Sequence, residues 1–315
     1  MPKISVIIPL YNKEKDIKKT LESLLVQSFS DYEAIIVNDG STDGSEAVVK
    51  SFTDDRIKYF NKVNEGVAFA RNYAVEKATA SFIAFLDADD YWYPKHLENL
   101  NNLTNKFPEA SWYATGYEKK HHKTLSVPLQ SPIMNQGNDW LGIIPNYFEN
   151  SFTDALAWTS AVCMKKEFFL SLNGFDTTIT NGAGEDTDLW IRAALKNPIA
   201  FSTQITAQHN LQGSNRISHT PTKNRVFMNP DNFLAEENVR PSLKKYLDLN
   251  RYSFALQHKM AGDIEAFKSY SKNIDPKNLT TKQNYILNKP KWIIKEMLKI
   301  QKMAVLTGFR FSSFK

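Results

Sequence analysis

Short apolar runs alternate with amphipathic stretches through the first 100 residues of the chain. Runs of four to eight apolar residues predict strands, and apolar positions that recur every three to four residues predict helices. Alternation of this kind favours right-handed βαβ units on a parallel sheet. The predicted strands cover residues 4–10, 32–37, 57–60 and 82–86, and the predicted helices cover residues 15–27, 45–52 and 67–78.

The pattern weakens in the middle of the chain and turns helical towards its end. Residues 109–151 are interrupted by Pro128, Pro132 and Pro145, which predicts loops and a short helix. Residues 158–169 are strand-like, and residues 186–196 have helical spacing. The composition beyond residue 209 is helical. We therefore expect an α/β domain with a mostly parallel central sheet flanked by helices, followed by a helical C-terminal appendage.

The composition is that of a folded protein, with 42% hydrophobic residues among 315. The single cysteine, Cys163, excludes an intrachain disulfide and favours a cytoplasmic location. No run reaches the roughly 18 apolar residues that a membrane-spanning helix needs. The apolar N-terminal run contains Pro9 and lacks a basic region before it, which favours a buried strand over a signal peptide.

Positive charge is concentrated at the C-terminus. The formal net charge is +5, yet the chain from Lys289 onward carries seven basic residues and one acid, so the remainder is close to neutral. This distribution excludes a nucleic-acid-binding field over the whole surface. Residues 289–315 are basic and amphipathic, which suits peripheral contact with an anionic membrane. The same pattern suits an ordinary helix that packs its apolar side on the protein.

Acidic residues directly follow two of the predicted strands. Asp87 and Asp89 lie one residue apart, so both carboxylates can reach one hard divalent cation that also binds diphosphate oxygens. A solvated acidic turn is the alternative for this short pattern. Asp39 follows another strand and can accept the imide N–H of a uracil ring, although the residues after it also suit helix capping.

Two further features carry candidate chemistry. Arg71 lies in a predicted helix, where it can pair with phosphate, stack on a base or form a surface salt bridge. Glu185 and Asp186 lie at the start of the predicted helix at 186–196. Free N–H groups at a helix start keep a carboxylate ionised, which suits a general base and is also common for structural reasons.

Taken together, these segments resemble the family 2 glycosyltransferases of the GT-A fold. The resemblance covers roughly residues 1–215 and rests on several segments in order. They are Val6-Ile7-Ile8-Pro9-Leu10-Tyr11-Asn12, Val37-Asn38-Asp39-Gly40-Ser41-Thr42-Asp43, Asn64-Glu65-Gly66 with Ala70-Arg71-Asn72, Phe85-Leu86-Asp87-Ala88-Asp89-Asp90, Gly174-Phe175-Asp176 and Gly184-Glu185-Asp186.

The resemblance implies a role for each matching position. Asp186 would be the general base, with Glu185 beside it. A divalent metal, Mn²⁺ or Mg²⁺, would be held by Asp89 and Asp87, with His209 as a further ligand. The residues implied for binding the nucleotide-sugar donor are Pro9, Tyr11, Asn12, Asp39, Asn64, Gly66, Arg71, Asp87 and Ala88.

The implied activity is an inverting transfer from a nucleotide-diphosphate sugar, with a UDP-sugar favoured, to a hydroxyl of a glycan or lipid-linked acceptor. The setting implied is bacterial polysaccharide biosynthesis, in the cytoplasm and at the inner face of the cell membrane. No Q-x-x-R-W motif follows Asp188, so one sugar per encounter is expected. Residues 1–220 would form the catalytic domain, with a nucleotide-binding half (1–100) and an acceptor-binding half (101–220), and residues 221–315 the helical region.

Two other functions stay open at this point. A sugar nucleotidyltransferase shares the nucleotide-binding layout, but the loop after its first strand is usually rich in glycine, which Asn12-Lys13-Glu14-Lys15 is not. An inactive scaffold that binds a glycan or a protein is the other alternative. The chain has neither the G-x-G-x-x-G of a dinucleotide-binding dehydrogenase nor a P-loop. The donor sugar, the acceptor and the oligomeric state are left undetermined.

Overall fold

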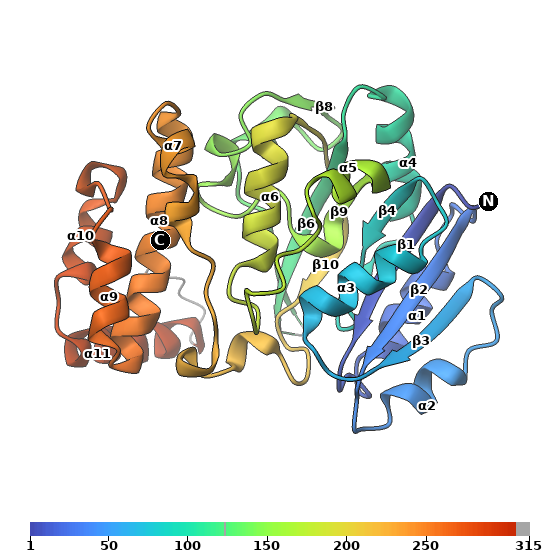
Figure 1. Cartoon of the computed structure of the whole chain (residues 1–315), viewed down its shortest axis with the longest axis horizontal. Coiled ribbons are helices and arrows are strands. Elements are labelled where there is room, and N and C mark those ends of the chain that lie inside the picture. The colour runs from blue at the N-terminus through green and yellow to red at the C-terminus, as the bar shows by residue number, and fades with distance from the viewer. Residues whose placement is uncertain (123, 307–315) are drawn as a thin grey trace. The chain divides into compact units, whose positions relative to one another are not determined.

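A computed structural model describes residues 1–122 and 124–306 of the chain (Figure 1). The chain divides into two compact units. The first unit comprises Met1–Thr220 and Arg225–Met228, and the second comprises Pro221–Asn224 and the chain from Asn229 onward. Each unit has its own buried apolar core.

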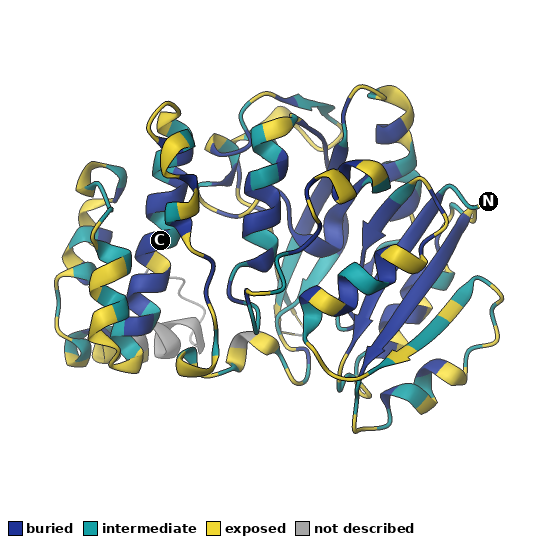
Figure 2. Ribbon diagram, viewed as in Figure 1, coloured by how far each residue is buried: buried dark blue, intermediate teal, exposed yellow. Residues whose placement is uncertain are grey.

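The first unit is a mixed α/β structure built on one ten-stranded sheet with the main order β3-β2-β1-β4-β9-β6-β10-β5. Its first four strands pair in parallel, and β1 and β2 are buried at every position (Figure 2). The helix α3 packs against β1 and β2. These elements confirm the predicted alternation: β1 (Ile4–Leu10), α1 (Ile17–Leu25), β2 (Tyr32–Asp39), α2 (Ser45–Lys50), β3 (Ile57–Lys62), α3 (Val67–Lys77) and β4 (Phe82–Phe85).

Beyond β4 the sheet becomes mixed rather than mostly parallel. The strand β9 runs antiparallel to both β4 and β6, whereas β6 and β10 pair in parallel. Short connections, such as that from β6 to β7, join antiparallel strands because a parallel pair needs a crossover. These elements are β5 (Tyr91–Trp92), α4 (His96–Lys106), β6 (Trp112–His122), β7 (Leu125–Pro128), β8 (Leu141–Ile144), β9 (Val162–Lys165), α5 (Lys166–Ser171), α6 (Glu185–Lys196) and β10 (Ile199–Asn210).

The expectation of loops over residues 109–151 is wrong, because β6, β7 and β8 lie there. The first six residues of β6 are buried, but its last five are polar: one glutamate and two lysines are half-buried, and two histidines are exposed. The polar second half of β6 is why the sequence pattern did not predict a strand there. Short 3-10 turns complete the unit at Pro132–Gln136, Glu149–Ser151, Thr159–Ala161 and Ile217–His219.

The second unit is helical, as expected for the region after residue 220. Its α11 buries Ile294 and packs Met297 against a cluster that includes Tyr252, Leu256 and Ile286. The unit contains α7 (Leu234–Glu237), α8 (Pro241–Ala261), α9 (Ile264–Ser271), α10 (Thr281–Leu287) and α11 (Lys291–Leu306), with 3-10 turns at Thr222–Asn224, Pro230–Phe233 and Pro276–Asn278.

The basic tail proposed for membrane contact is only partly described. In α11, Ile294 and Met297 contact the protein, as in the ordinary packing alternative, while Trp292 and Ile300 are about two-thirds exposed. Residues 307–315 of this tail lie outside the described residues. Among the helices that the structure describes, none combines the length and apolar character required to cross a bilayer.

Candidate active site

A pocket of about 280 Å³ opens where β1, β2 and β4 end, at one edge of the sheet. Loops after parallel strands form the usual ligand site of open α/β sheets. Every site residue predicted from the sequence lines this pocket except Asn12 and Asp186. The residues that line it include Pro9, Tyr11, Lys13, Asp39, Asn64, Gly66, Arg71, Asp87, Ala88, Asp89, Asp90, Asn181, Glu185, His209, Asn215, Arg216, Ile217 and Thr220.

Asp39 is buried and holds the loop that follows β3. Its Oδ1 accepts hydrogen bonds from Lys62 Nζ (2.9 Å) and the Glu65 backbone N–H (3.0 Å). Its Oδ2 accepts one from the backbone N–H of Gly66 at 2.8 Å. Gly66 has φ of 103°, which a residue with a Cβ rarely adopts. The carboxylate therefore shapes one wall of the pocket, whatever else it binds.

Asn12 binds the loop that follows β2. It has φ of 50°, and its Oδ1 accepts a hydrogen bond from the Thr42 backbone N–H at 2.7 Å. Its own backbone N–H donates to Ser41 Oγ at 3.0 Å. These contacts tie the turn after β1 to the loop after β2. The structure places Asn12 in a turn between two residues that line the pocket, Tyr11 and Lys13, and not in the lining itself.

Arg71 joins two parts of the site that are far apart in sequence. Its Nη2 donates to Asp87 Oδ1 at 2.7 Å, and its Nη1 lies 3.4 Å from Glu185 Oε1. The guanidinium also lies over the Phe175 ring, 5.1 Å from its centroid. Both Arg71 Nε and Glu185 Oε2 are buried without a hydrogen-bond partner among the described residues. The contact network at Arg71 is thus incomplete.

Glu185 and Asp186 occupy the first turn of α6, after Gly184 with φ of 106°. Burial raises the pKa of Glu185 to about 7, and the charge of Asp186 adds to this while Arg71 opposes it. Asp186 is only half-buried, and its Oδ1 accepts a hydrogen bond from the Thr187 backbone N–H at 2.6 Å. Asp186 does not line the pocket, but it directly follows a residue that does.

The acidic turn after β4 contains three carboxylates with different partners. Asp89 Oδ2 forms an ion pair with Lys13 Nζ at 2.6 Å. Asp90 accepts hydrogen bonds from Ser160 Oγ (2.7 Å) and the Asn210 backbone N–H (3.0 Å). Burial raises the pKa of both Asp89 and Asp90, and the neighbouring carboxylates add to the effect, while Lys13 opposes it at Asp89. Lys13 thus pairs with Asp89 and Arg71 with Asp87, while Asp90 is bonded to neutral donors.

His209 is placed beside this turn by β10. Its ring stacks on Trp158 with centroids 4.8 Å apart, and its Nε2 lies 3.2 Å from Arg216 Nη2. Burial, with help from Arg216, lowers the pKa of His209 to about 4. The imidazole is neutral at physiological pH, which is the form that binds metals.

The donor set fits a metal ion that is shared with a ligand. Among the residues that the structure describes, no three histidine, cysteine, aspartate or glutamate side chains gather closely enough to hold a metal alone. Asp87 and Asp89 nevertheless offer the carboxylate oxygens that Mg²⁺ and Mn²⁺ prefer, in a turn that brings three carboxylates to the pocket. Protein sites for Mg²⁺ commonly supply one or two carboxylates and leave the remaining positions to phosphate oxygens and water.

Sequence reasoning missed several residues of this pocket. Lys13 was considered only as part of a loop without glycine, yet its side chain is 12% exposed and lies against Asp89. Arg216 and Asn215 lie in the segment that contains His209, which the resemblance connects to the metal, but neither of them was assigned a role. Asp90 was quoted with the acidic turn but not assigned a role. The one feature of the sequence that could have indicated a role for Lys13 is its position directly after the segment that ends in Tyr11-Asn12.

The sequence matches one protein family over half of its length and is similar to several bacterial glycosyltransferases. The family described as Glycosyl transferase family 2 matches residues 5–162, half of the chain. An uncharacterized glycosyltransferase of Rickettsia conorii is 33% identical over 228 residues, which are 71% of this chain and 35% of that protein. The uncharacterized glycosyltransferase YibD of Escherichia coli is 43% identical over 150 residues, 44% of this chain and 43% of YibD. The chain therefore spans about a third of the Rickettsia relative.

The fold is similar to that of a solved structure. Residues 1–349 of Staphylococcus aureus TarS, in complex with UDP-GlcNAc, match with a TM-score of 0.63 and 19% sequence identity. The match covers 90% of this chain and 86% of that chain. At this level of identity the likeness is one of fold, and it confirms the expected GT-A architecture.

Proposed function

Because the chain belongs to glycosyltransferase family 2, we propose that it transfers one sugar from a nucleotide-diphosphate donor to a hydroxyl of a glycan or lipid-linked acceptor, with inversion. The observation that carries this proposal is the pocket at the ends of β1, β2 and β4, which gathers the predicted donor-binding residues. The UDP-GlcNAc bound by TarS makes a uridine nucleotide the first choice of donor.

The nucleoside end of the donor would lie against the loop that Asp39 holds. The two backbone N–H groups bound by Asp39 fix the course of this loop, and Gly66 leaves open space where a Cβ would stand. Pro9 and Tyr11 form the adjoining wall. A carboxylate that is already held by fixed donors can accept the N–H of a uracil ring without reorganising.

The diphosphate end would lie over the acidic turn. Asp89 and Asp87, with His209 beside them, would hold a divalent metal there. Such an ion, when bound, neutralises the charge that develops on a departing nucleoside diphosphate. Asp87 is oriented by Arg71 at 2.7 Å, and Asp89 is covered by the chain after β10.

Asp186 would act as the general base. Its place in the first turn of α6 favours the ionised carboxylate, which takes the proton of the acceptor hydroxyl as the oxygen attacks the anomeric carbon. The bond between that carbon and the diphosphate oxygen breaks in the same displacement, so the configuration inverts. Glu185 links this helix to Arg71 and thus to the donor side of the pocket.

The division of labour within the chain follows from this arrangement. Residues 1–100 would bind the nucleotide, residues 101–220 would present the acceptor, and the helical region would contribute acceptor, membrane or partner contacts. The absence of a Q-x-x-R-W motif in the sequence supports the transfer of a single sugar.

A donor panel tests this proposal. Wild type, Asp89→Ala and Asp186→Asn are titrated with nucleotide sugars in the presence of Mn²⁺, Mg²⁺ or EDTA, and donor hydrolysis is followed in parallel. We expect one donor to bind with metal, Asp89→Ala to lose that binding, and Asp186→Asn to bind while its turnover falls by roughly 10²- to 10⁴-fold.

The control variant is Lys18→Met, because Lys18 is 71% exposed on α1 and outside the pocket. It should match wild type in binding and turnover. If no nucleotide sugar binds with any metal, the transferase proposal is wrong and a scaffold that binds a glycan or a protein explains the chain better.

A further inference from the structure

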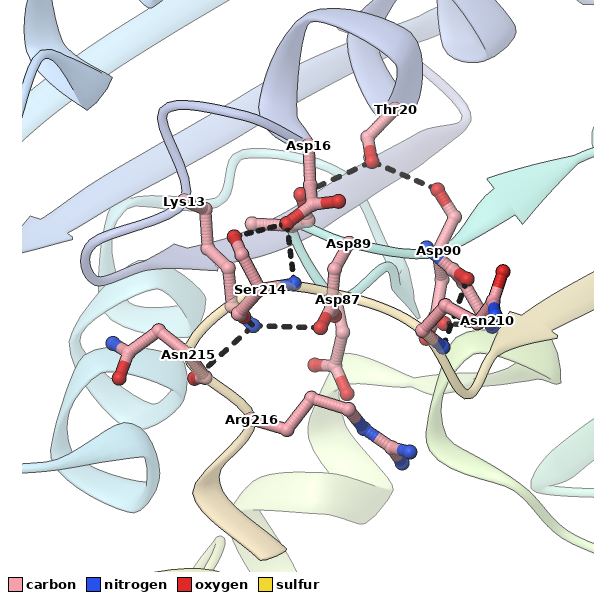
Figure 3. A network of polar contacts seen from close by, with 12 residues as sticks. Lys13, Asp16, Thr20, Asp87, Asp89, Asp90, Asn210, Ser214, Asn215 and Arg216 are labelled. Carbon is pink, nitrogen blue, oxygen red and sulfur yellow. Dashed lines mark hydrogen bonds and ion pairs between the residues drawn. The ribbon is translucent and has the colours of Figure 1, made fainter. Parts of the chain in front are cut away.

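The Lys13 ammonium is enclosed by oxygen atoms at the acidic turn. Its Nζ lies 2.6 Å from Asp89 Oδ2, 2.5 Å from the Ser214 carbonyl oxygen and 3.3 Å from that of Asn215. An ammonium group has three N–H donors, so this set satisfies all of them. Figure 3 shows Lys13 between Asp89 and the chain after β10. A positive charge with three oxygen neighbours is thus built into the site.

The chain from Asn210 to Arg216 closes over Asp89 and is held there from several sides. Gly213 lies so close that an added Cβ would stand 2.4 Å from Asp89 Oδ2, so only glycine fits. Asp16 Oδ2 accepts hydrogen bonds from the Ser214 backbone N–H at 2.8 Å and from the Ser214 hydroxyl. Together with Lys13, these contacts leave the Asp89 side chain only 15% exposed.

A second cation cannot approach Asp89 Oδ2 freely while Lys13 holds it. The two positive charges would compete for one carboxylate oxygen, and the glycine contact blocks the same face. A bound diphosphate would reduce this competition, because its negative oxygen atoms offer the Lys13 ammonium a partner other than Asp89. Lys13 follows Pro9 by four residues and Tyr11 by two, and like them it lines the pocket.

We propose that Lys13 holds the cation position on Asp89 in the nucleotide-free protein and gives it up to a divalent metal when the donor diphosphate binds. This inference rests on the proposed function and assigns Lys13 a donor-binding role at the metal and diphosphate end of the pocket. Its consequence is thermodynamic coupling. The metal binds weakly alone and more tightly when the nucleotide is bound. The metal in turn increases the affinity for the nucleotide by the same factor.

Calorimetric titration of Mn²⁺ tests the coupling without reference to catalysis. Wild type, Lys13→Met and Lys13→Arg are titrated with Mn²⁺ alone and again with saturating UDP. In Lys13→Met the Asp89 oxygen is released, so Mn²⁺ should bind the nucleotide-free protein at least roughly fivefold more tightly, the lower end of usual coupling between two sites. The factor by which UDP strengthens Mn²⁺ binding should shrink correspondingly. Lys13→Arg keeps the charge and should behave like wild type.

Two controls separate this effect from misfolding. Lys18→Met removes an exposed lysine from α1 and should leave both Mn²⁺ titrations unchanged. The thermal unfolding midpoint of each variant shows whether it is folded. Unchanged or weaker Mn²⁺ binding by folded Lys13→Met would overturn the proposal, as would UDP binding with no Mn²⁺ uptake by wild type or variant. Failure of every nucleotide to bind wild type would instead refute the proposed function.

Discussion

Two buried arginines, one in each unit, are surrounded by carboxylates, and they differ in how completely they are bonded. In the second unit Arg251 donates to Asp231, Glu237 and Asp248, at distances between 2.7 and 3.1 Å. Asp248 in turn accepts hydrogen bonds from the Asp275 backbone N–H and the Asn278 side chain. In the first unit Arg71 has one short contact, to Asp87, and a 3.4 Å contact to Glu185.

The difference indicates which network is structural and which is functional. Buried polar groups in native proteins are nearly always paired, so a complete network contributes to stability and an incomplete one requires a reason. Arg71 Nε and Glu185 Oε2 lack partners among the described residues, and both residues line the pocket. We infer that the network at Arg71 is completed by ligands, whereas the network at Arg251 is completed by the protein.

The largest expected effect is on stability, from Arg251→Met. The substitution removes the buried cation shared by Asp248 and Glu237 and leaves Lys244 as their remaining ion-pair partner. Breaking a buried ion pair typically costs about 3–5 kcal/mol. Urea unfolding followed by circular dichroism should show this loss in the free energy of unfolding. Donor binding by the protein that is still folded should match wild type. A loss below about 1 kcal/mol would mean that the network at Arg251 is not structural.

The matched substitution in the other network, Arg71→Met, should act mainly on function. Asp87 and Glu185 lose their shared partner, and misplacement of catalytic groups can lower turnover about 100-fold, or roughly 2.7 kcal/mol. The free energy of unfolding should fall less than in Arg251→Met, because Glu185 can take up a proton near neutral pH. Equal turnover in Arg71→Met and wild type, measured at saturating donor, would contradict this assignment.

The residues of the network at Arg71 could be predicted from the sequence, whereas those of the network at Arg251 could not. Asp87, Arg71 and Glu185 belong to segments that resemble those of family 2 glycosyltransferases. The resemblance therefore identified all three as site residues. Arg251 and its partners are scattered over a helical region, and nothing in their spacing distinguishes them from surface charges. Likewise β1 was predicted to its exact ends because all seven residues are buried, whereas β6 is half polar.

Contacts between segments far apart in the chain also could not be predicted from the sequence. Asn210 reaches Asp90, and Ser214 reaches Asp16, across intervals of 120 and 198 residues. These pairings follow from the parallel alignment of β10 with β6 and its antiparallel contact with β5. The strand β10 itself was not predicted. The position of residues 210–216 over Asp89 could therefore not be predicted either.

A smaller effect, on the pH dependence of stability, should come from Glu185→Gln. The pKa of Glu185 is raised by burial from 4.5 to about 7, so the folded state keeps a proton that the unfolded state loses. Raising the pH from 5 to 7 should therefore destabilise wild type relative to Glu185→Gln, by about 2 kcal/mol. Urea unfolding at both pH values measures this difference.

The control for that experiment is Glu22→Gln, since Glu22 is 56% exposed on α1. Its unfolding free energy should follow that of wild type at both pH values. A pH-independent difference between wild type and Glu185→Gln would show that Glu185 is ionised throughout the range in the folded protein.

The smallest expected effect is that of Lys299→Ala in the second unit. Lys299 pairs with Glu296 on α11 at 2.7 Å, but the two side chains are 69% and 58% exposed. Exposed ion pairs are screened by water, so the free energy of unfolding should change by less than about 0.5 kcal/mol. A change as large as that of Arg251→Met would mean that burial does not separate structural from marginal ion pairs in this unit.

Hydrogen–deuterium exchange tests most directly whether the incomplete network belongs to a nucleotide site. The protein is compared with and without Mn²⁺ and the nucleotide that the donor panel selects. The account predicts slower exchange in residues 62–66, 86–90 and 210–216, three segments that each contribute residues to the pocket, and no change around Arg251. Slower exchange only around Arg251, or elsewhere outside the pocket, would contradict it.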